Sequence, residues 1–83
     1  MNSHAIEIGS LLRDRRRHLG IRQIDFAALS QVAVHTVSDI ESGKGNPTLD
    51  ILLKILDPLG LELAVRPKIP TTAETVSLKT PKR

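Results

Sequence analysis

The sequence contains no cysteine, tryptophan or tyrosine, and its one aromatic side chain is Phe26. The absence of cysteine excludes a disulfide framework and thiolate metal sites. Because aromatic residues are so scarce, the core must be aliphatic, and a protein that stacks single-stranded bases on aromatic platforms is disfavoured. Among nucleic acids, a duplex is therefore the better candidate ligand.

Long apolar runs are also missing, since no segment approaches the roughly 20 residues of a membrane-spanning helix. The N-terminus carries Asn2, His4 and Glu7 instead of the basic and then apolar order of a signal peptide. A membrane is therefore not an expected partner, and the cytoplasm is the expected location.

Residue groupings that support catalysis or metal binding are missing as well. His4, His18 and His35 lack the spacing of metal ligands, and no acidic pair flanks a plausible nucleophile. Gly43 and Gly45 lack the strand and helix context of a phosphate-binding loop. We therefore expect no enzyme activity, no metal and no cofactor.

The length of 83 residues allows one small core, and a domain of this size hides only roughly 60% of its unfolded surface. Oligomerisation is therefore expected.

The net charge of +3 is unevenly distributed along the chain. Residues 1–65 hold seven basic and eight acidic residues, whereas residues 66–83 hold five basic residues and one acidic residue. A basic cluster precedes the middle of the chain, as either a phosphate-facing edge or a solvated face. Its members are Arg13, Arg15, Arg16, Arg17 and Arg22.

The spacing of apolar residues predicts an all-α domain of five helices. The predicted helices cover residues 8–19, 23–29 and 34–41, then a segment from Asn46-Pro47-Thr48 to Leu56, then a short fifth turn that ends at Gly60. Thr48 is a suitable N-cap for the fourth helix, and Gly20 is a suitable left-handed end for the first. Residues 1–6 are expected to form a loose leader.

Residues 23–42, QIDFAALSQVAVHTVSDIES, have the pattern of two short helices joined by a tight turn. Small or apolar residues stand where the helices must cross, at Phe26, Ala27, Val32, Val37 and Ile40. Two helices that cross steeply leave room for little more than a methyl group at their closest approach, which Ala27 supplies. The pattern is a helix-turn-helix and makes DNA the leading ligand. The face left free to enter a groove consists of Val34, His35, Ser38 and Asp39.

After Gly60 the apolar period changes to two, which predicts a β-strand. The predicted strand consists of Leu61, Glu62, Leu63, Ala64, Val65 and Arg66. No second strand is predicted, so its expected partner is the same strand of a second copy, in an antiparallel ribbon across a twofold axis. The alternative is an extended tail that lies on the core. The chain is thus divided into a domain over residues 1–66 and a basic tail over residues 67–83 that is predicted to be disordered.

With these elements placed, residues 8–66 resemble the lambda-repressor-like helix-turn-helix family of phage repressors and XRE-like regulators. The residues that carry the resemblance are Leu19-Gly20, Gln23, Phe26-Ala27, Val32, Thr36-Val37-Ser38, Ile40-Glu41, Gly43-Lys44, Asn46-Pro47-Thr48-Leu49 and Leu59-Gly60. The segment LDPLGLELAVRPK is similar, more narrowly, to HipB-type antitoxins, whose helical core is followed by a strand that pairs in the dimer.

The resemblance implies roles for individual residues, each with plain solvent exposure as its alternative. The positions that would contact base edges in the major groove are Ala33, Val34, His35, Ser38 and Asp39. The positions that would contact phosphates are Arg16, Arg22, Gln23, Thr36, Ser42, Lys44 and Asn46. Arg16 also matches, together with Glu41, a structural pair that ties the first helix to the third in repressors of this fold.

Two residues depart from the family pattern. Gln31 stands where the turn usually carries glycine, so a non-glycine residue must adopt a left-handed or bridging conformation. Ala33 stands where the third helix usually begins with serine or threonine, which removes a cap worth about 0.5 to 2 kcal/mol.

The function that the resemblance implies is that of a homodimer that binds a palindromic operator and represses transcription of its own operon. As a HipB-like antitoxin, the protein would also bind a HipA-like kinase toxin. Two alternatives stay open: a stand-alone phage-type or metabolic repressor without a protein partner, and a partner-binding module whose DNA-binding motif is vestigial.

Overall fold

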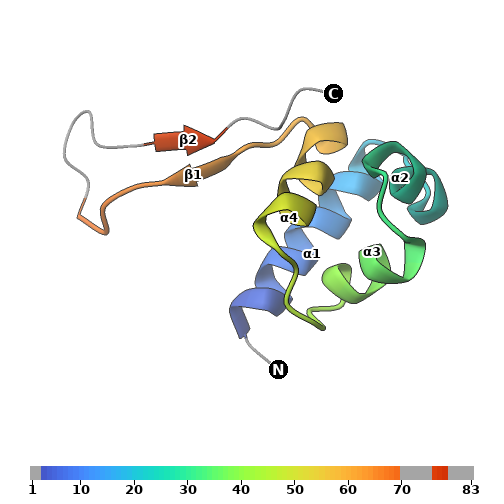
Figure 1. Ribbon diagram of the computed structural model, residues 1–83, viewed down its shortest axis with the longest axis horizontal. Helices are drawn as coiled ribbons and strands as arrows, with labels where there is room; N and C mark the ends of the chain where they lie inside the picture. The colour runs from blue at the N-terminus through green and yellow to red at the C-terminus, as the bar shows by residue number, and fades with distance from the viewer. Residues whose placement is uncertain (1–2, 70–75, 79–83) are drawn as a thin grey trace.

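The computed structural model describes residues 3–69 and 76–78 of the chain (Figure 1). In chain order, the elements are α1 (Ser3–His18), α2 (Gln23–Ser30), α3 (Val34–Glu41), α4 (Leu49–Leu56), the 3-10 turn η1 (Asp57–Leu59), β1 (Leu63–Val65) and β2 (Val76–Leu78). The helices form one body, and the two strands form an arm that projects from it (Figure 1). In the described part of the chain, no helix is long and apolar enough to cross a membrane.

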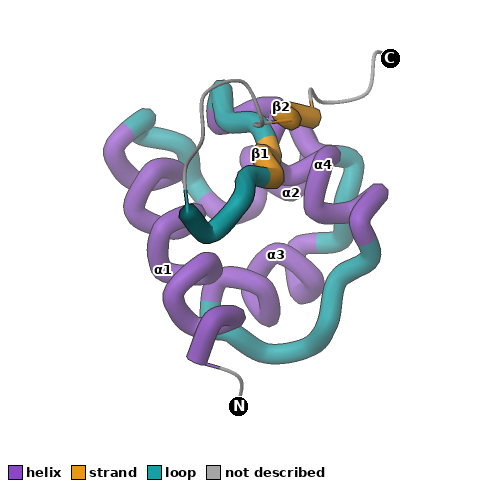
Figure 2. The backbone as a smooth tube through the Cα atoms, turned by 90° about the vertical axis from the view of Figure 1, so that its left-hand side faces the viewer, coloured by secondary structure: helices purple, strands orange, loops and turns teal. Residues whose placement is uncertain are grey.

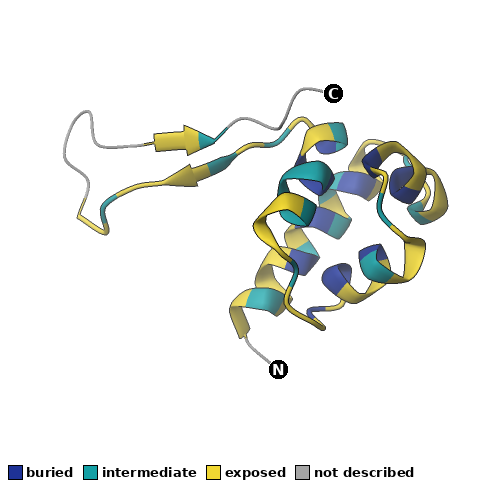
Figure 3. Cartoon of the chain, in the orientation of Figure 1, coloured by how far each residue is buried: buried dark blue, intermediate teal, exposed yellow. Residues whose placement is uncertain are grey.

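The core lies between the helices and is aliphatic apart from Phe26, which is fully buried (Figure 3). The buried hydrophobic residues are Leu12, Phe26, Ala27, Val37, Ile40, Ile55, Leu56 and Leu59. Of the five residues predicted at the crossing of α2 and α3, four belong to this cluster and Val32 packs against it while partly exposed. The sequence pattern therefore located the centre of the core.

Helix α1 begins earlier than the sequence predicts. Residues 1–6 were expected to form a loose leader, whereas α1 starts at Ser3; residues 1 and 2 lie outside the described part. The reason is tertiary contact. Gly9 packs against the carbonyl oxygens of Ile40 and Glu41, and the backbone of Ile6 lies against Gly43. The first turns of α1 are therefore held by the end of α3, which local propensity does not encode.

The predicted five helices become four α-helices and one 3-10 turn. The Thr48 side chain accepts a hydrogen bond from the Ile51 amide at 3.2 Å, so it caps α4 as expected. Pro58 lies at the start of η1, and Gly60 ends that turn with a left-handed φ of 68°. Because proline cannot donate the hydrogen bond that would continue α4, the chain tightens into a single 3-10 turn.

The arm corrects the prediction that the chain holds only one strand. Strand β1 pairs antiparallel with β2 of the same chain, with Leu63 opposite Leu78, Ala64 opposite Ser77 and Val65 opposite Val76. The prediction of disorder over residues 67–83 is therefore wrong at β2; residues 70–75 and 79–83 lie outside the described part. β2 was missed because a three-residue segment shows one step of alternation, whereas a period of two is recognisable over about four to eight residues.

Candidate nucleic-acid interface

The turn between α2 and α3 is closed by backbone hydrogen bonds. The Gln31 amide donates to the carbonyl oxygen of Ala28 at 3.2 Å, and the Val32 amide donates to that of Ala27 at 3.1 Å. Gln31 has φ 57° and ψ 40°, so the predicted left-handed conformation of a non-glycine residue is confirmed. Ala33 then precedes α3 in an extended conformation and makes no side-chain cap, as its identity predicts.

Helix α3 is divided into a buried and an exposed side. Val37, Ile40 and Glu41 are buried. All five positions predicted to contact bases are exposed: Ala33, Val34, His35, Ser38 and Asp39. Val34 is 44% exposed even though it is apolar. The side of α3 that carries these residues is therefore available to a ligand.

The loop between α3 and α4 brings several predicted phosphate contacts beside this face. The Ser42 hydroxyl donates to the Asp39 carbonyl oxygen at 3.0 Å, and the Lys44 amide donates to the same oxygen at 2.8 Å. A hollow of about 210 Å³ lies between α3 and this loop, and Thr36, Asp39, Lys44 and Asn46 are among the residues that line it. Thr36, Lys44 and Asn46 are thus brought together at one edge of α3.

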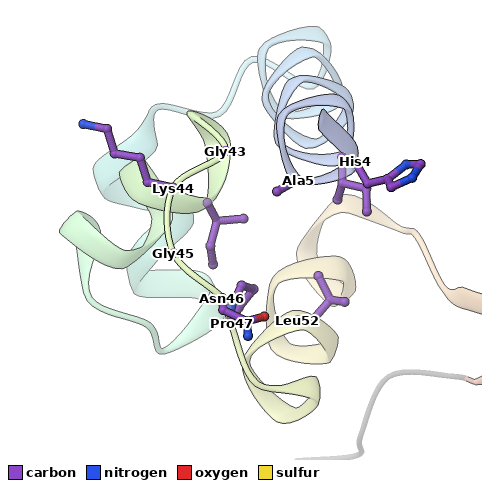
Figure 4. Close-up of a pocket in the computed structure, with 10 residues that line it drawn as sticks. His4, Ala5, Gly43, Lys44, Gly45, Asn46, Pro47 and Leu52 are labelled. Carbon is purple, nitrogen blue, oxygen red and sulfur yellow. The ribbon is translucent and has the colours of Figure 1, made fainter. Parts of the chain in front are cut away.

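A second hollow, of about 500 Å³, lies on the side of this loop that faces α1 and α4 (Figure 4). It is lined by His4 and Ala5 of α1, Leu52 of α4 and the loop around Gly43 and Asn46. In the same view, the Lys44 side chain extends away from α1 and α4 (Figure 4). The Lys44 ammonium therefore points to the outer surface of the loop, where a polyanion can reach it.

Arg16 and Glu41, which were predicted to pair, form a bidentate ion pair between α1 and α3. Arg16 Nε donates to Glu41 Oε2 at 2.7 Å, and Arg16 Nη2 donates to Glu41 Oε1 at 2.9 Å. Arg16 Nη1 donates to the Ile21 carbonyl oxygen at 2.8 Å, and Gln23 Nε2 donates to Glu41 Oε1 at 3.3 Å. One network thus joins the end of α1, the start of α2 and the end of α3.

This network is buried, since the Arg16 and Glu41 side chains are only 9% and 4% exposed. Hydrogen bonding to Glu41 raises the pKa of Arg16, although burial acts in the opposite direction. The guanidinium therefore carries its positive charge opposite the Glu41 carboxylate. Because its Nε, Nη1 and Nη2 atoms each donate a hydrogen bond within the fold, Arg16 holds α3 in place, and its predicted phosphate contact stays a prediction.

Two other arginines of the basic cluster, Arg15 and Arg22, have different surroundings. Arg15 Nε donates to the Leu59 carbonyl oxygen at 3.0 Å and so ties α1 to η1. Arg22 remains on the surface, where its Nε contacts Asp25 Oδ2 at 2.7 Å. The hydrogen bond to Asp25 raises the pKa of Arg22. The sequence analysis missed Asp25, although its spacing of three residues from Arg22 on a predicted helix is the signal for such a pair.

Two glycines allow the close approach of α1 to α3; the sequence analysis did not name Gly9 and did not predict this role for Gly43. A methyl group on Gly9 would collide with the Ile40 carbonyl oxygen and lie 2.8 Å from the Glu41 carbonyl oxygen. Gly43 has φ 81°, and a methyl group there would lie 2.8 Å from Ile6 Cα. Neither contact has a local sequence signal, because each glycine lies against the backbone of a residue that is more than 30 positions away in the sequence.

Comparison with known proteins places this geometry in a family. Residues 12–65 match the helix-turn-helix family HTH_3, and the chain belongs to that family. The predicted resemblance to XRE-like regulators is thereby confirmed at the level of the family, whereas the narrower HipB type is not established. The helix-turn-helix is also the part of the chain in which all five predicted base-contact positions lie exposed.

Two similar sequences are regulators by name. An uncharacterized HTH-type transcriptional regulator of Haemophilus influenzae is 44% identical over 52 residues, which are 63% of this chain and 53% of that protein. The HTH-type transcriptional regulator DdrOP3 of Deinococcus deserti is 36% identical over 50 residues, which are 60% of this chain and 39% of that protein. The chain thus spans about half or less of the length of these relatives.

Two solved structures share the fold. The restriction-modification controller protein C.AhdI of Aeromonas hydrophila superposes with a TM-score of 0.70 at 30% identity, over 74% of this chain and 92% of that one. The clp gene regulator ClgR of Corynebacterium glutamicum superposes with a TM-score of 0.65 at 24% identity, over 69% and 61% of the two chains. At that identity, the likeness to ClgR concerns the fold alone.

Proposed function

We propose that the protein binds duplex DNA in a sequence-specific manner and regulates transcription. The observation that carries the proposal is the exposed side of α3, with five predicted base-contact residues free of the core and Lys44 beside them. A helix of this kind fits the major groove, where each base pair presents a distinct pattern of donors and acceptors. The names of the two similar regulators support the same function.

The predicted base-contact side chains at the start and along the exposed side of α3 differ in chemistry, so each suits a different base. Ala33 and Val34 offer only apolar contact, which suits the methyl group of thymine. His35 donates to guanine, and Ser38 either donates or accepts. Asp39 accepts from the amino group of cytosine, because an exposed carboxylate beside phosphates needs a base donor as its partner.

Phosphate contacts come from the elements on both sides of α3. Arg22 and Lys44 supply exposed cations. Gln23 lies at the start of α2, whose N-cap makes no side-chain hydrogen bond, so the amides of this helix end are available to bind a phosphate. The remaining contacts are polar side chains that fix the register of the protein on the duplex: Thr36, Ser42 and Asn46. Arg16 acts indirectly, by orienting α3 through Glu41.

The proposed functional unit is a homodimer on a palindromic operator, with one α3 in each half-site and half-sites about 34 Å apart. Repression of the protein's own operon stays part of this proposal. The HipB-like antitoxin role with a HipA-like toxin stays a prediction without structural support, because the strand that motivated it pairs within the chain. The vestigial-motif alternative stays open, and the duplex-binding measurements below decide it, because a vestigial motif would bind selected and shuffled duplexes alike.

The test begins by selecting bound duplexes from a random-sequence library with the full chain. Affinities for the selected duplex and for a shuffled duplex are then measured by fluorescence anisotropy at several salt concentrations. We expect His35→Ala and Ser38→Ala to cost about 1 to 3 kcal/mol at particular base pairs. His18→Ala, at an exposed histidine outside the interface, is the matched control and should change nothing.

A second pair of variants tests the phosphate contacts. Lys44→Ala should weaken binding to all duplexes alike and lower the salt dependence by about one phosphate contact. Lys68→Ala changes the net charge by the same amount at an exposed site beyond β1 and should have a much smaller effect. Equal affinity of the parent chain for selected and shuffled duplexes at physiological salt would refute the proposal.

A further inference from the structure

The loop between α3 and α4, residues 42–48, carries predicted phosphate contacts, among them Lys44 and Asn46. Its first half is tied to α3, because the Lys44 amide donates to the Asp39 carbonyl oxygen at 2.8 Å. In the described part of the chain, no backbone hydrogen bond involves residues 45–47. The path of the loop beyond Lys44 therefore depends on what packs against it.

The inner side of this loop is only partly supported by the helices. The hollow of about 500 Å³ lies between the loop, the first turn of α1 and Leu52 of α4. Figure 4 shows His4 and Ala5 on the α1 side of this hollow, with Gly45 and Asn46 on the loop. The described side chains do not fill this space, so the core fixes the loop only in part.

Ile6 of α1 supplies a direct contact with the loop. A methyl group on Gly43 would lie 2.7 Å from Ile6 Cγ1 and 2.8 Å from Ile6 Cα, so the side chain and the backbone of Ile6 both lie against Gly43. Figure 2 shows the loop beginning beside the first turns of α1 before it runs to α4. The first turns of α1 therefore set the position of the backbone next to Lys44.

The two neighbours of Lys44 are glycines with left-handed backbone conformations. Gly43 has φ 81° and Gly45 has φ 77°. Glycine adopts left-handed and right-handed conformations about equally well, so the backbone around Lys44 has little conformational preference of its own. The direction of the Lys44 side chain consequently depends on tertiary contacts, of which that between Ile6 and Gly43 lies one residue away.

We propose that Ile6 is a positioning residue for DNA binding: it holds Gly43 in place and so orients Lys44 toward the phosphates of the duplex that α3 enters. Ile6 acts through the loop and makes no DNA contact of its own. The inference rests on the proposed duplex binding and extends it to a residue that precedes the matched range 12–65. Because Ile6 is 43% exposed and lies outside the buried core, its side chain can be shortened without opening that core.

The first test shortens the side chain in the full chain. Ile6→Ala removes the Cγ1 contact and should weaken binding to selected and shuffled duplexes alike, by up to roughly tenfold at about 0.1 M salt, the loss expected for one phosphate contact. The slope of log affinity against log salt should fall in magnitude by up to about 0.9. Ile6→Val keeps both Cγ atoms and should bind like the parent. Leu11→Ala is the matched control, since it shortens a 67% exposed apolar side chain of the same helix.

Coupling to Lys44 separates positioning from a general loss of structure. If Ile6 acts through Lys44, Ile6→Ala should cost distinctly less affinity in a chain that already carries Lys44→Ala, because the contact to be oriented is gone. A general effect on folding would instead multiply with the loss caused by Lys44→Ala. Urea unfolding followed by circular dichroism checks that each variant is folded under the binding conditions.

The outcomes distinguish this inference from the proposed function. Parent-like affinity and salt dependence of Ile6→Ala would overturn the inference alone, as would losses that multiply with that of Lys44→Ala or an equal loss in Leu11→Ala. In each of these cases sequence-specific binding by the parent chain still stands. A parent chain that binds selected and shuffled duplexes equally would refute the proposed function, and the inference with it, before any variant is compared.

Discussion

Replacing Arg16 with methionine should destabilise the fold more than any surface change, because it leaves the Glu41 carboxylate buried without its cation. Glu41 is 4% exposed in its side chain and would keep only the Gln23 amide as a donor, at 3.3 Å. Stranding one partner of a buried ion pair costs about 3 to 5 kcal/mol. A chain of 83 residues has a total stability of about 4 to 12 kcal/mol, so this loss is a large fraction of it.

The reverse change, Glu41→Leu, should cost somewhat less. Arg16 would keep its hydrogen bond to the Ile21 carbonyl oxygen, and its side chain is slightly more exposed than that of Glu41. The double variant Arg16→Met with Glu41→Leu fills the site with apolar side chains and strands no charge. We therefore expect it to be more stable than either single variant, with a coupling free energy of at least about 2 kcal/mol.

The assay is urea unfolding followed by far-ultraviolet circular dichroism, because the chain has no tryptophan or tyrosine to report by fluorescence. All variants are compared at one protomer concentration, since association shifts apparent stability. A fixed concentration of a stabilising osmolyte keeps the single variants folded at zero urea. If the effects of the two single changes simply add in the double variant, Arg16 and Glu41 do not interact and the packing of α1 on α3 described above is wrong.

Three smaller predictions follow from individual contacts. Gln31→Gly should stabilise the fold by up to about 1 kcal/mol in the same urea assay, because Gln31 has φ 57°; an unchanged midpoint would mean that the turn is unstrained. Gly9→Ala should destabilise by about 1 to 3 kcal/mol, since the added methyl group collides with the Ile40 carbonyl oxygen; a neutral result would show that α1 shifts freely. Asp25→Asn should free Arg22 and tighten binding to every duplex while steepening its salt dependence; looser binding would assign Asp25 a DNA contact of its own.

The helical part of the fold was predictable because its signals are local or shared with a known family. The apolar spacing in residues 23–42 located α2, the turn and α3, and Thr48 located the start of α4. The pairing of Arg16 with Glu41 came from the family resemblance, since 25 residues separate the two and no local period connects them.

The remaining features depend on contacts between distant segments. The early start of α1 follows from Gly9 and Gly43, whose neighbours come from other elements. Strand β2 contains three residues, and its apolar face has meaning only beside Leu63 and Val65 of β1. A surface ion pair such as that of Arg22 with Asp25 was within reach of the sequence and was overlooked.

Helix α3 is held at both of its ends, and α1 contacts the C-terminal one. Gly9 packs against the carbonyl oxygens of Ile40 and Glu41, and Arg16 binds the Glu41 carboxylate. Helix α1 therefore contacts the C-terminal turn of α3 through both its backbone and a side chain. The N-terminal turn follows Ala33, which makes no side-chain cap, and Val37 anchors this turn in the core. We therefore expect a change at the contact between Arg16 and Glu41 to alter the orientation of α3 and weaken binding to every duplex. A change at an exposed residue of α3 such as His35 should instead alter which base pairs are preferred. The ratio of specific to non-specific affinity consequently distinguishes the two groups of variants, even where their losses for the selected duplex are equal.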